Sequence, residues 1–132
     1  MIEIIEHTAD IRLRVSGKSL QELFTEALRG TIGLLQPQKG ARRVQRVVKV
    51  EAPDTTILLV DFLSEALSNA HANREAYDDA VFSSLTETSA IAQLTGNDAL
   101  AFGEDVKAVT YHEAEVRRDP NGQWSTVLVY DL

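Results

Sequence analysis

The 132-residue sequence contains no cysteine, and this absence excludes several kinds of chemistry at once. Disulfide bonds, thiolate nucleophiles and thiolate zinc ligands all require the missing sulfur atom. Apolar runs are also short: none approaches the ~20 residues that a transmembrane helix needs, and the first residues lack a signal-peptide pattern. We therefore expect a cytoplasmic protein with no membrane partner.

Glycine and proline are scarce, at 7 and 3 residues, and there is no low-complexity tract. With 44% hydrophobic and 25% charged residues, the composition predicts one globular domain over residues 1–132. Positive charge is scarce too, because the net charge is −7, which argues against direct nucleic-acid binding. We interpret the one basic cluster as a solvated strand edge and loop; a surface for a partner or its RNA is the alternative. Its members are Lys39, Arg42, Arg43, Arg46 and Lys49.

The common catalytic motifs are absent as well. The sequence has no glycine-rich phosphate loop, no GxSxG elbow and no HExxH helix. His71 and Glu75 have the four-residue spacing of metal ligands on a helix, but they fall where that helix should fray. We therefore interpret them as surface residues.

Two helices are predicted, over residues 20–35 and 55–72. Ser19 precedes Glu22 by three residues, which is the capping-box signature, and Asp54 or Thr55 can cap the second helix. Pro37 and Gly40 should close the first helix and open a loop.

Strands are predicted from apolar alternation and from the turn residues that bracket them. The predicted strands are 2–6, 11–16, 43–52, 80–87, 90–96, 105–118 and 123–132. Residues 96–103 should be a polar connection, and the DPNG sequence at 119–122 should form a type I turn of a hairpin. These elements predict an α+β fold, a mostly antiparallel β-sheet with two α-helices packed on one face.

Two places concentrate polar groups that can bind protons or metals. Glu6, His7, Thr8 and Asp10 interrupt an apolar, strand-like opening, and Asp131 with Leu132 follows the last strand. If these two ends lie side by side, their carboxylates converge, and a hard cation with oxygen ligands would relieve the repulsion. A solvated, frayed tail and a structural His7 are the alternatives, and Lys107 alone reads as a surface lysine.

Four segments resemble the archease family, in the order in which they occur there: IEHTADIRLRVSG, LLVDFLSEAL, VKAVTYHEAEV and VLVYDL. The resemblance extends from the first strand to the last residue, although residues 71–104 match only in general character. It implies an archease-like sheet with two helices. It also implies a non-catalytic partner of the RtcB-type tRNA-splicing RNA ligase, which promotes guanylylation and repeated turnover of that ligase and meets RNA only through it.

The same resemblance implies a divalent cation, calcium by preference, with magnesium or manganese compatible with the same oxygen ligands. Its ligands would be Asp10, Asp131 and the main-chain oxygens of Leu132. Lys107 is implied in activating the ligase, and Asp61 and Glu65 remain on the second helix as further activation candidates. The supporting residues are Glu6, His7, Thr8 and His112. Within DFLSEAL, Phe62 and Ser64 differ from the Trp and Asn frequent in the family, which puts partner specificity in question.

A second hypothesis uses the same acidic cluster differently. The protein would be a metal-dependent hydrolase of small phosphorylated or nucleotide substrates, with His7 or His112 as general base. A general chaperone or a helper of RNA modification is a third option.

Overall fold

A computed structural model describes residues 1–6 and 10–132, which form an α+β fold with antiparallel strands and two helices. The predicted fold class is confirmed. The helices are α1 (Leu20–Leu34) and α2 (Thr55–Asn73). The strands are β1 (Ile2–Glu6), β2 (Asp10–Gly17), β3 (Pro37–Glu51), β4 (Glu75–Leu85), β5 (Ser89–Phe102), β6 (Ala108–Thr110), β7 (Arg117–Arg118) and β8 (Trp124–Asp131).

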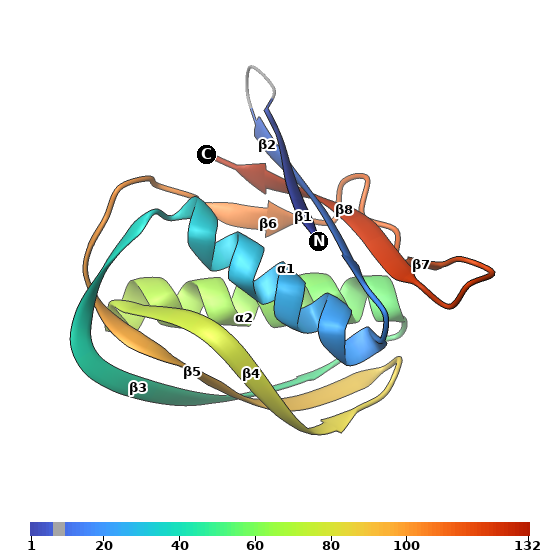
Figure 1. Cartoon of the computed structure of the whole chain (residues 1–132), viewed down its shortest axis with the longest axis horizontal. Helices are drawn as coiled ribbons and strands as arrows, with labels where there is room; N and C mark the ends of the chain where they lie inside the picture. The colour runs from blue at the N-terminus through green and yellow to red at the C-terminus, as the bar shows by residue number, and fades with distance from the viewer. Residues whose placement is uncertain (7–9) are drawn as a thin grey trace.

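The strands divide between two sheets, and both helices lie between them (Figure 1). The larger sheet has the order β1-β2-β8-β6, with β7 also pairing with β8, and the smaller one has the order β3-β5-β4. Each sheet therefore packs one face against the helices and turns its other face outward. In the larger sheet the last strand, β8, pairs with β2, which lies near the start of the chain.

Both helices begin where the sequence predicts. The side chain of Ser19 accepts a hydrogen bond from the Glu22 N–H (3.1 Å), and Asp54 accepts one from the Ile57 N–H (2.8 Å). Each cap satisfies one of the N–H groups that a helix start leaves unpaired. Among residues 1–6 and 10–132, no helix is long and apolar enough to cross a membrane.

The core is built around three phenylalanine rings from different elements. Phe24 of α1, Phe62 of α2 and Phe82 of β4 have ring centroids 5.4 to 6.1 Å apart. Such tilted and edge-on arrangements suit the charge distribution of aromatic rings. On the opposite side of α1, the fully buried Leu13 of β2 packs into the same core, so the helices connect the two sheets.

Two predicted connections are wrong, because both are parts of strands. β3 begins directly at Pro37 and contains Gly40; Pro37 opens an edge strand, a position where proline is tolerated. β5 continues through residues 96–102, because this central strand pairs with β4 as far as Asp98 and with β3 as far as Phe102. Gly96 permits this close pairing: a Cβ there would lie 1.9 Å from the carbonyl oxygen of Ala76.

The long strand predicted over 105–118 is also wrong, because only its two ends, β6 and β7, pair with β8. Between them the chain turns away at Glu113, which has a φ of 60°, and the Val116 N–H donates to Thr56 Oγ1 of α2 (2.9 Å). The hairpin turn itself is confirmed: the Gly122 N–H donates to the Asp119 carbonyl (2.9 Å), and β7 pairs with β8.

Candidate functional site

The candidate site lies at the edge of the larger sheet where β2 begins and β8 ends (Figure 1). Asp10 is directly opposite Asp131, which on its other side is opposite Ala108 of β6. Directly opposed residues of antiparallel strands project to the same face, so the two carboxylates share the outer face of the sheet. The start of β2 and the end of β8 therefore do lie side by side.

The carboxylate of Asp10 has an oxygen that no hydrogen bond satisfies. Its Oδ1 is buried and has no hydrogen-bond partner among the described residues, and Arg12 Nη1 is 3.9 Å away. Leaving a charged oxygen buried without a partner is costly, so the position suits a cation. Asp131 and Leu132 are exposed beside it.

Within the described ranges, no group of three or more His, Asp and Glu side chains could hold a metal ion. Any cation at this sheet edge would therefore need main-chain oxygens in addition to the carboxylates of Asp10 and Asp131. Hard cations such as Ca²⁺ accept carbonyl and carboxylate oxygens alike, so the donor set fits one.

Arg12 and Glu113 complete the site, and sequence reasoning missed both. Arg12 is two residues beyond Asp10 in β2, on the same face, and its Nε donates to Glu113 Oε2 (2.7 Å). The period of two along β2 could have placed Arg12 beside Asp10. Nothing in the sequence signals Glu113, which comes from the segment between β6 and β7, 101 residues away.

Lys107 borders the site through its backbone, since its N–H donates to the Asp131 carbonyl (2.9 Å). Its exposed side chain lines a groove of about 530 Å³ between α2 and β6, together with Ser64, Ser68 and His71. Lys107 therefore contacts the last strand through its main chain, and its role in activating the ligase stays a prediction.

Asp61 is tied to the segment that follows β6. The Tyr111 hydroxyl donates to Asp61 Oδ1, and this hydrogen bond raises the pKa of Tyr111 above its usual value. Glu65 lies four residues after Asp61 in α2, and His112 directly follows Tyr111; both are exposed. The contact between Tyr111 and Asp61 thus connects α2 to the segment that carries Glu113.

Of the three supporting residues predicted at the start of the chain, only Glu6 is among the residues that the structure describes. Glu6 is the last residue of β1 and pairs with Ile11, while His7 and Thr8 lie outside the described residues. A supporting role for these three residues therefore stays a prediction.

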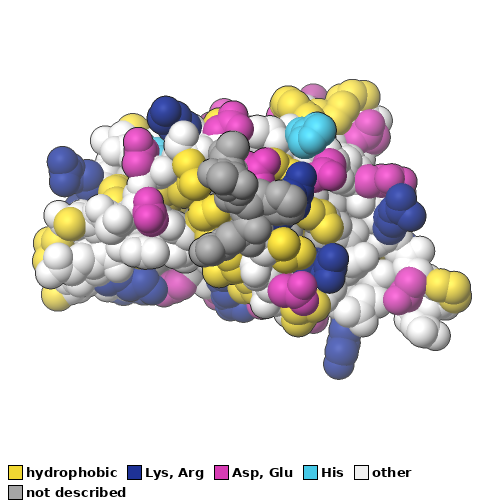
Figure 2. All heavy atoms as spheres, turned by 90° about the horizontal axis from the view of Figure 1, so that it is seen from above, with side chains coloured by type: hydrophobic (Ala, Val, Ile, Leu, Met, Phe, Trp, Pro, Cys, Tyr) yellow, Lys and Arg dark blue, Asp and Glu magenta, His cyan; other side chains and the backbone are white. Residues whose placement is uncertain are grey.

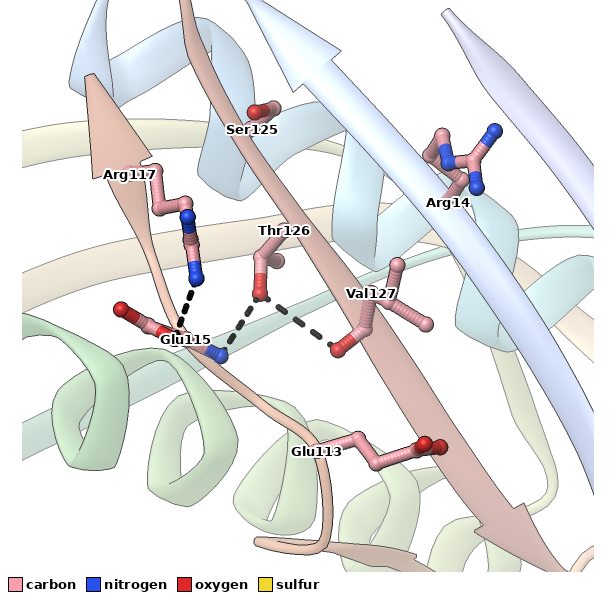
Figure 3. Close-up of a pocket in the computed structure, with 7 residues that line it drawn as sticks. All are labelled: Arg14, Glu113, Glu115, Arg117, Ser125, Thr126 and Val127. Atoms are coloured by element: carbon pink, nitrogen blue, oxygen red, sulfur yellow. Dashed lines mark hydrogen bonds and ion pairs between the residues drawn. The ribbon is translucent and has the colours of Figure 1, made fainter. Parts of the chain in front are cut away.

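A shallow hollow of about 250 Å³ lies farther along the same face (Figure 3). Figure 3 shows Glu113 reaching across β8 towards β2, with Arg14 on β2 and Arg117 on β7 at either side. Arg117 pairs with Glu115 (2.8 Å) and Arg14 with Glu3 (3.3 Å). Because each arginine here faces a carboxylate, the hollow has no strong preference for a ligand of either charge.

Acidic side chains are distributed among hydrophobic ones over this side of the molecule (Figure 2). This agrees with the net charge of −7 and does not form the continuous basic surface of a nucleic-acid binder.

Within the basic cluster on β3, the charge of Arg46 is paired with a buried carboxylate. Arg46 makes two hydrogen bonds to Glu75 (2.7 and 3.1 Å), and the Tyr77 hydroxyl makes a third (2.7 Å). Glu75 is only 2% exposed, so its predicted place on the surface is wrong, whereas His71 is exposed as predicted. Burial alone would raise the pKa of Glu75, but the hydrogen bonds from Arg46 and Tyr77 outweigh it and lower that pKa.

The remaining arginine and lysine contacts of this cluster are weaker. Arg43 donates to Asn97 (2.8 Å), and both Lys39 and Arg43 lie 3.8 Å from Asp78. These exposed pairs are consistent with a solvated strand edge, and a partner surface here stays the alternative.

The sequence and the fold are both similar to those of archeases. The model of the Archease protein family (MTH1598/TM1083) matches residues 2–132. Protein archease of Thermococcus kodakarensis is 33% identical over 141 residues, covering 98% of this chain and 97% of the relative. Protein archease of Methanosarcina barkeri is 31% identical over 139 residues, covering 98% and 94%.

Among solved structures, an archease and possible chaperone (TM1083) from Thermotoga maritima shares the fold with a TM-score of 0.73. Its sequence is 22% identical, and the match covers 100% of this chain and 98% of the other.

Proposed function

The chain belongs to the archease family, and on that basis we propose that it is a non-catalytic activator of an RtcB-type tRNA-splicing RNA ligase. It promotes guanylylation of the ligase and its repeated turnover in tRNA splicing or RNA repair in the cytoplasm. Its contact with RNA is indirect, through the ligase.

One observation supports this proposal most: Asp10 and Asp131 are in register at one edge of the sheet, and Asp10 Oδ1 lacks a hydrogen-bond partner among the described residues. Two carboxylates directly opposite each other repel, so a sheet edge of this kind calls for positive charge. The pair comes from the first and the last of the four segments on which the family resemblance rests.

Asp10, Asp131 and the main-chain oxygens of Leu132 would hold the cation. With oxygen donors alone, calcium, magnesium and manganese are all compatible, and calcium best tolerates an irregular donor set. When bound, a divalent cation supplies positive charge opposite the oxygens of a nucleotide or of a ligase carboxylate.

The residues of this chain have separable tasks in the proposal. Asp10 and Asp131 form the acidic edge, in which Asp131 is exposed and the Asp10 side chain is 26% exposed. Lys107 keeps β8 in register through its backbone hydrogen bond to Asp131, and its exposed ammonium is available to an anionic group of the ligase. Asp61 and Glu65 add negative charge along α2, and the hydrogen bond to Tyr111 fixes the position of Asp61.

The test is a reconstituted assay of RNA ligation with the ligase in substoichiometric amount. Unaltered protein should increase the number of turnovers per ligase molecule, and Asp10→Ala and Asp131→Ala should each abolish most of that increase. Glu51→Gln is the matched control, because Glu51 is an exposed carboxylate in the smaller sheet, and it should activate as the unaltered protein does. Activation that survives both alanine substitutions would refute the proposal.

A second arm separates the activator from a hydrolase. Purified protein incubated with nucleotides and a divalent ion, without ligase, should release no product. Turnover under those conditions that depends on Asp10 would favour the metal-dependent hydrolase instead, with the exposed His112 as the first general base to test. General protection of an unrelated protein from aggregation would favour a chaperone.

A further inference from the structure

Arg12 lies between two carboxylates but forms a hydrogen bond with only one of them. Its Nε donates to Glu113 Oε2 at 2.7 Å, whereas its Nη1 is 3.9 Å from Asp10 Oδ1. The second distance is within the range of an ion pair but too long for a hydrogen bond. The side chain is 19% exposed, so both contacts are partly shielded from water.

This arrangement is unusual because a guanidinium beside a carboxylate commonly makes two parallel hydrogen bonds with it. Here Asp10 Oδ1 remains buried and without a hydrogen-bond partner in the described part of the chain, although a donor lies close by. The contact with Glu113 accounts for this, since it directs the Nε–H of Arg12 away from Asp10.

Glu113 itself has a backbone conformation that glutamate rarely adopts. Its φ is 60°, in the left-handed region that favours glycine. Such residues persist where surrounding contacts enforce them, and they concentrate at functional sites. The neighbouring contacts of Tyr111 with Asp61 and of Val116 with Thr56 hold the segment on either side of Glu113 against α2.

We propose that Arg12 and Glu113 act as a positioning pair that keeps Asp10 open to a divalent cation. The inference rests on the cation site proposed above. The guanidinium offsets the repulsion between Asp10 and Asp131 while the cation is absent, and Glu113 prevents it from closing over the Asp10 carboxylate. Arg12 and the cation therefore compete for Asp10, and Glu113 shifts that competition towards the cation.

The proposal predicts an order of affinities that can be measured by calorimetric titration of the full chain with calcium. Arg12→Gln should bind calcium about tenfold more tightly, because the substitution removes a positive charge that lies beside the site and repels the divalent ion. Glu113→Gln should bind about tenfold more weakly, because it releases Arg12 to make hydrogen bonds with Asp10.

The double variant Arg12→Gln/Glu113→Gln decides between positioning and simple charge. If Glu113 acts by holding Arg12, its substitution should change the affinity less than about twofold once Arg12 is glutamine. If Glu113 acts only through its own negative charge, its loss should weaken binding equally in both backgrounds, and the proposal is then wrong.

Arg14 and Glu3 provide the matched control. They form a similar ion pair on the same face of β2 and β1 (3.3 Å), with Arg14 one step farther from Asp10. Arg14→Gln and Glu3→Gln should change calcium affinity less than about threefold, since exposed charges at greater distance are screened by salt. Changes as large as those at Arg12 and Glu113 would overturn the proposal.

Asp10→Asn distinguishes failure of this inference from failure of the cation site. If the unaltered protein binds no calcium, or if Asp10→Asn binds it equally well, the proposed cation site is wrong. The proposed role of Arg12 and Glu113, which depends on that site, is then wrong too. If Asp10→Asn abolishes binding but Glu113→Gln leaves the affinity unchanged, only the positioning pair is wrong.

Discussion

The hydroxyls of Thr31 and Tyr130 form a hydrogen bond with each other. Replacing Thr31 with valine should destabilise the protein more than replacing Tyr130 with phenylalanine. The Tyr130 side chain is fully buried, and its oxygen lies 2.6 Å from Thr31 Oγ1. Thr31 Oγ1 also donates to the carbonyl of Ala27 one turn earlier in α1 (2.7 Å). Because a threonine hydroxyl has a single proton, the Tyr130 O–H must be the donor to Thr31.

The two substitutions leave different groups unpaired. Thr31→Val is nearly isosteric but leaves the Tyr130 hydroxyl buried without a partner, which costs about 1–3 kcal/mol of the free energy of unfolding. Tyr130→Phe removes that hydroxyl, and Thr31 keeps its bond to Ala27, so the cost is about 0.5–1.5 kcal/mol. The double variant should be close to Tyr130→Phe alone, because neither substitution then leaves an unpaired hydroxyl.

Urea denaturation measures these free energies, with the fluorescence of Trp124 and far-UV circular dichroism as independent probes of unfolding. Trp124 is the single tryptophan and lies in β8, the strand that carries Tyr130. The slope of the free energy against urea should be the same for all variants. The reasoning is refuted if Thr31→Val costs less than Tyr130→Phe, or if the double variant loses the sum of the two single costs.

Two further stability predictions concern glycine and a buried carboxylate. Gly96→Ala should lower the free energy of unfolding by about 1–3 kcal/mol, because the new Cβ would overlap the Ala76 carbonyl oxygen. Gly33→Ala should raise it by about 0.5–1 kcal/mol, because Gly33 lies in α1 with open space around the added Cβ, and urea denaturation measures both changes. The pKa of Glu75 is lowered, so the stability it contributes is present above pH ~4.5 and is lost as the pH falls through the lowered value. Glu75→Gln should therefore flatten that acid limb in thermal unfolding between pH 2.5 and 6, and an unchanged limb would count against the contact with Arg46.

The parts of the fold that the sequence predicts are those specified by local contacts. Ser19 and Asp54 cap the helices through residues three positions away, and the DPNG turn closes through Asp119 and Gly122. These signals are complete within one turn of the chain, so a single sequence contains them.

The errors occur where a distant partner decides the conformation. The predicted polar connection over 96–103 instead extends β5 as far as Phe102, because β4 pairs with it to Asp98 and β3 pairs with it to Phe102. The strand predicted over 105–118 is interrupted because Thr56 of α2 takes the Val116 N–H that a sheet neighbour would otherwise use. The division into two sheets likewise depends on which strands find each other, and alternation along one strand does not specify that.

The candidate site shows the same division between local and distant information. Asp10 and Asp131 come from two of the segments that resemble the family, and the pairing of β2 with β8 brings them into register. Arg12 follows from the period of two in β2. The contact between Arg12 and Glu113 spans 101 residues and depends on a left-handed residue that is not glycine, so no sequence pattern predicts it.

The last two residues of β8 show why the fold and the site can change independently. Tyr130 points into the core and is held by Thr31, whereas its neighbour Asp131 points to the outer face and is exposed. Alternation along one strand thus gives adjacent residues opposite tasks. A substitution of Asp131 that keeps its backbone hydrogen bond with Lys107 should therefore leave the free energy of unfolding within about 0.5 kcal/mol while removing a ligand of the proposed cation. Loss of activation by Asp131→Ala can for this reason be attributed to the site rather than to unfolding.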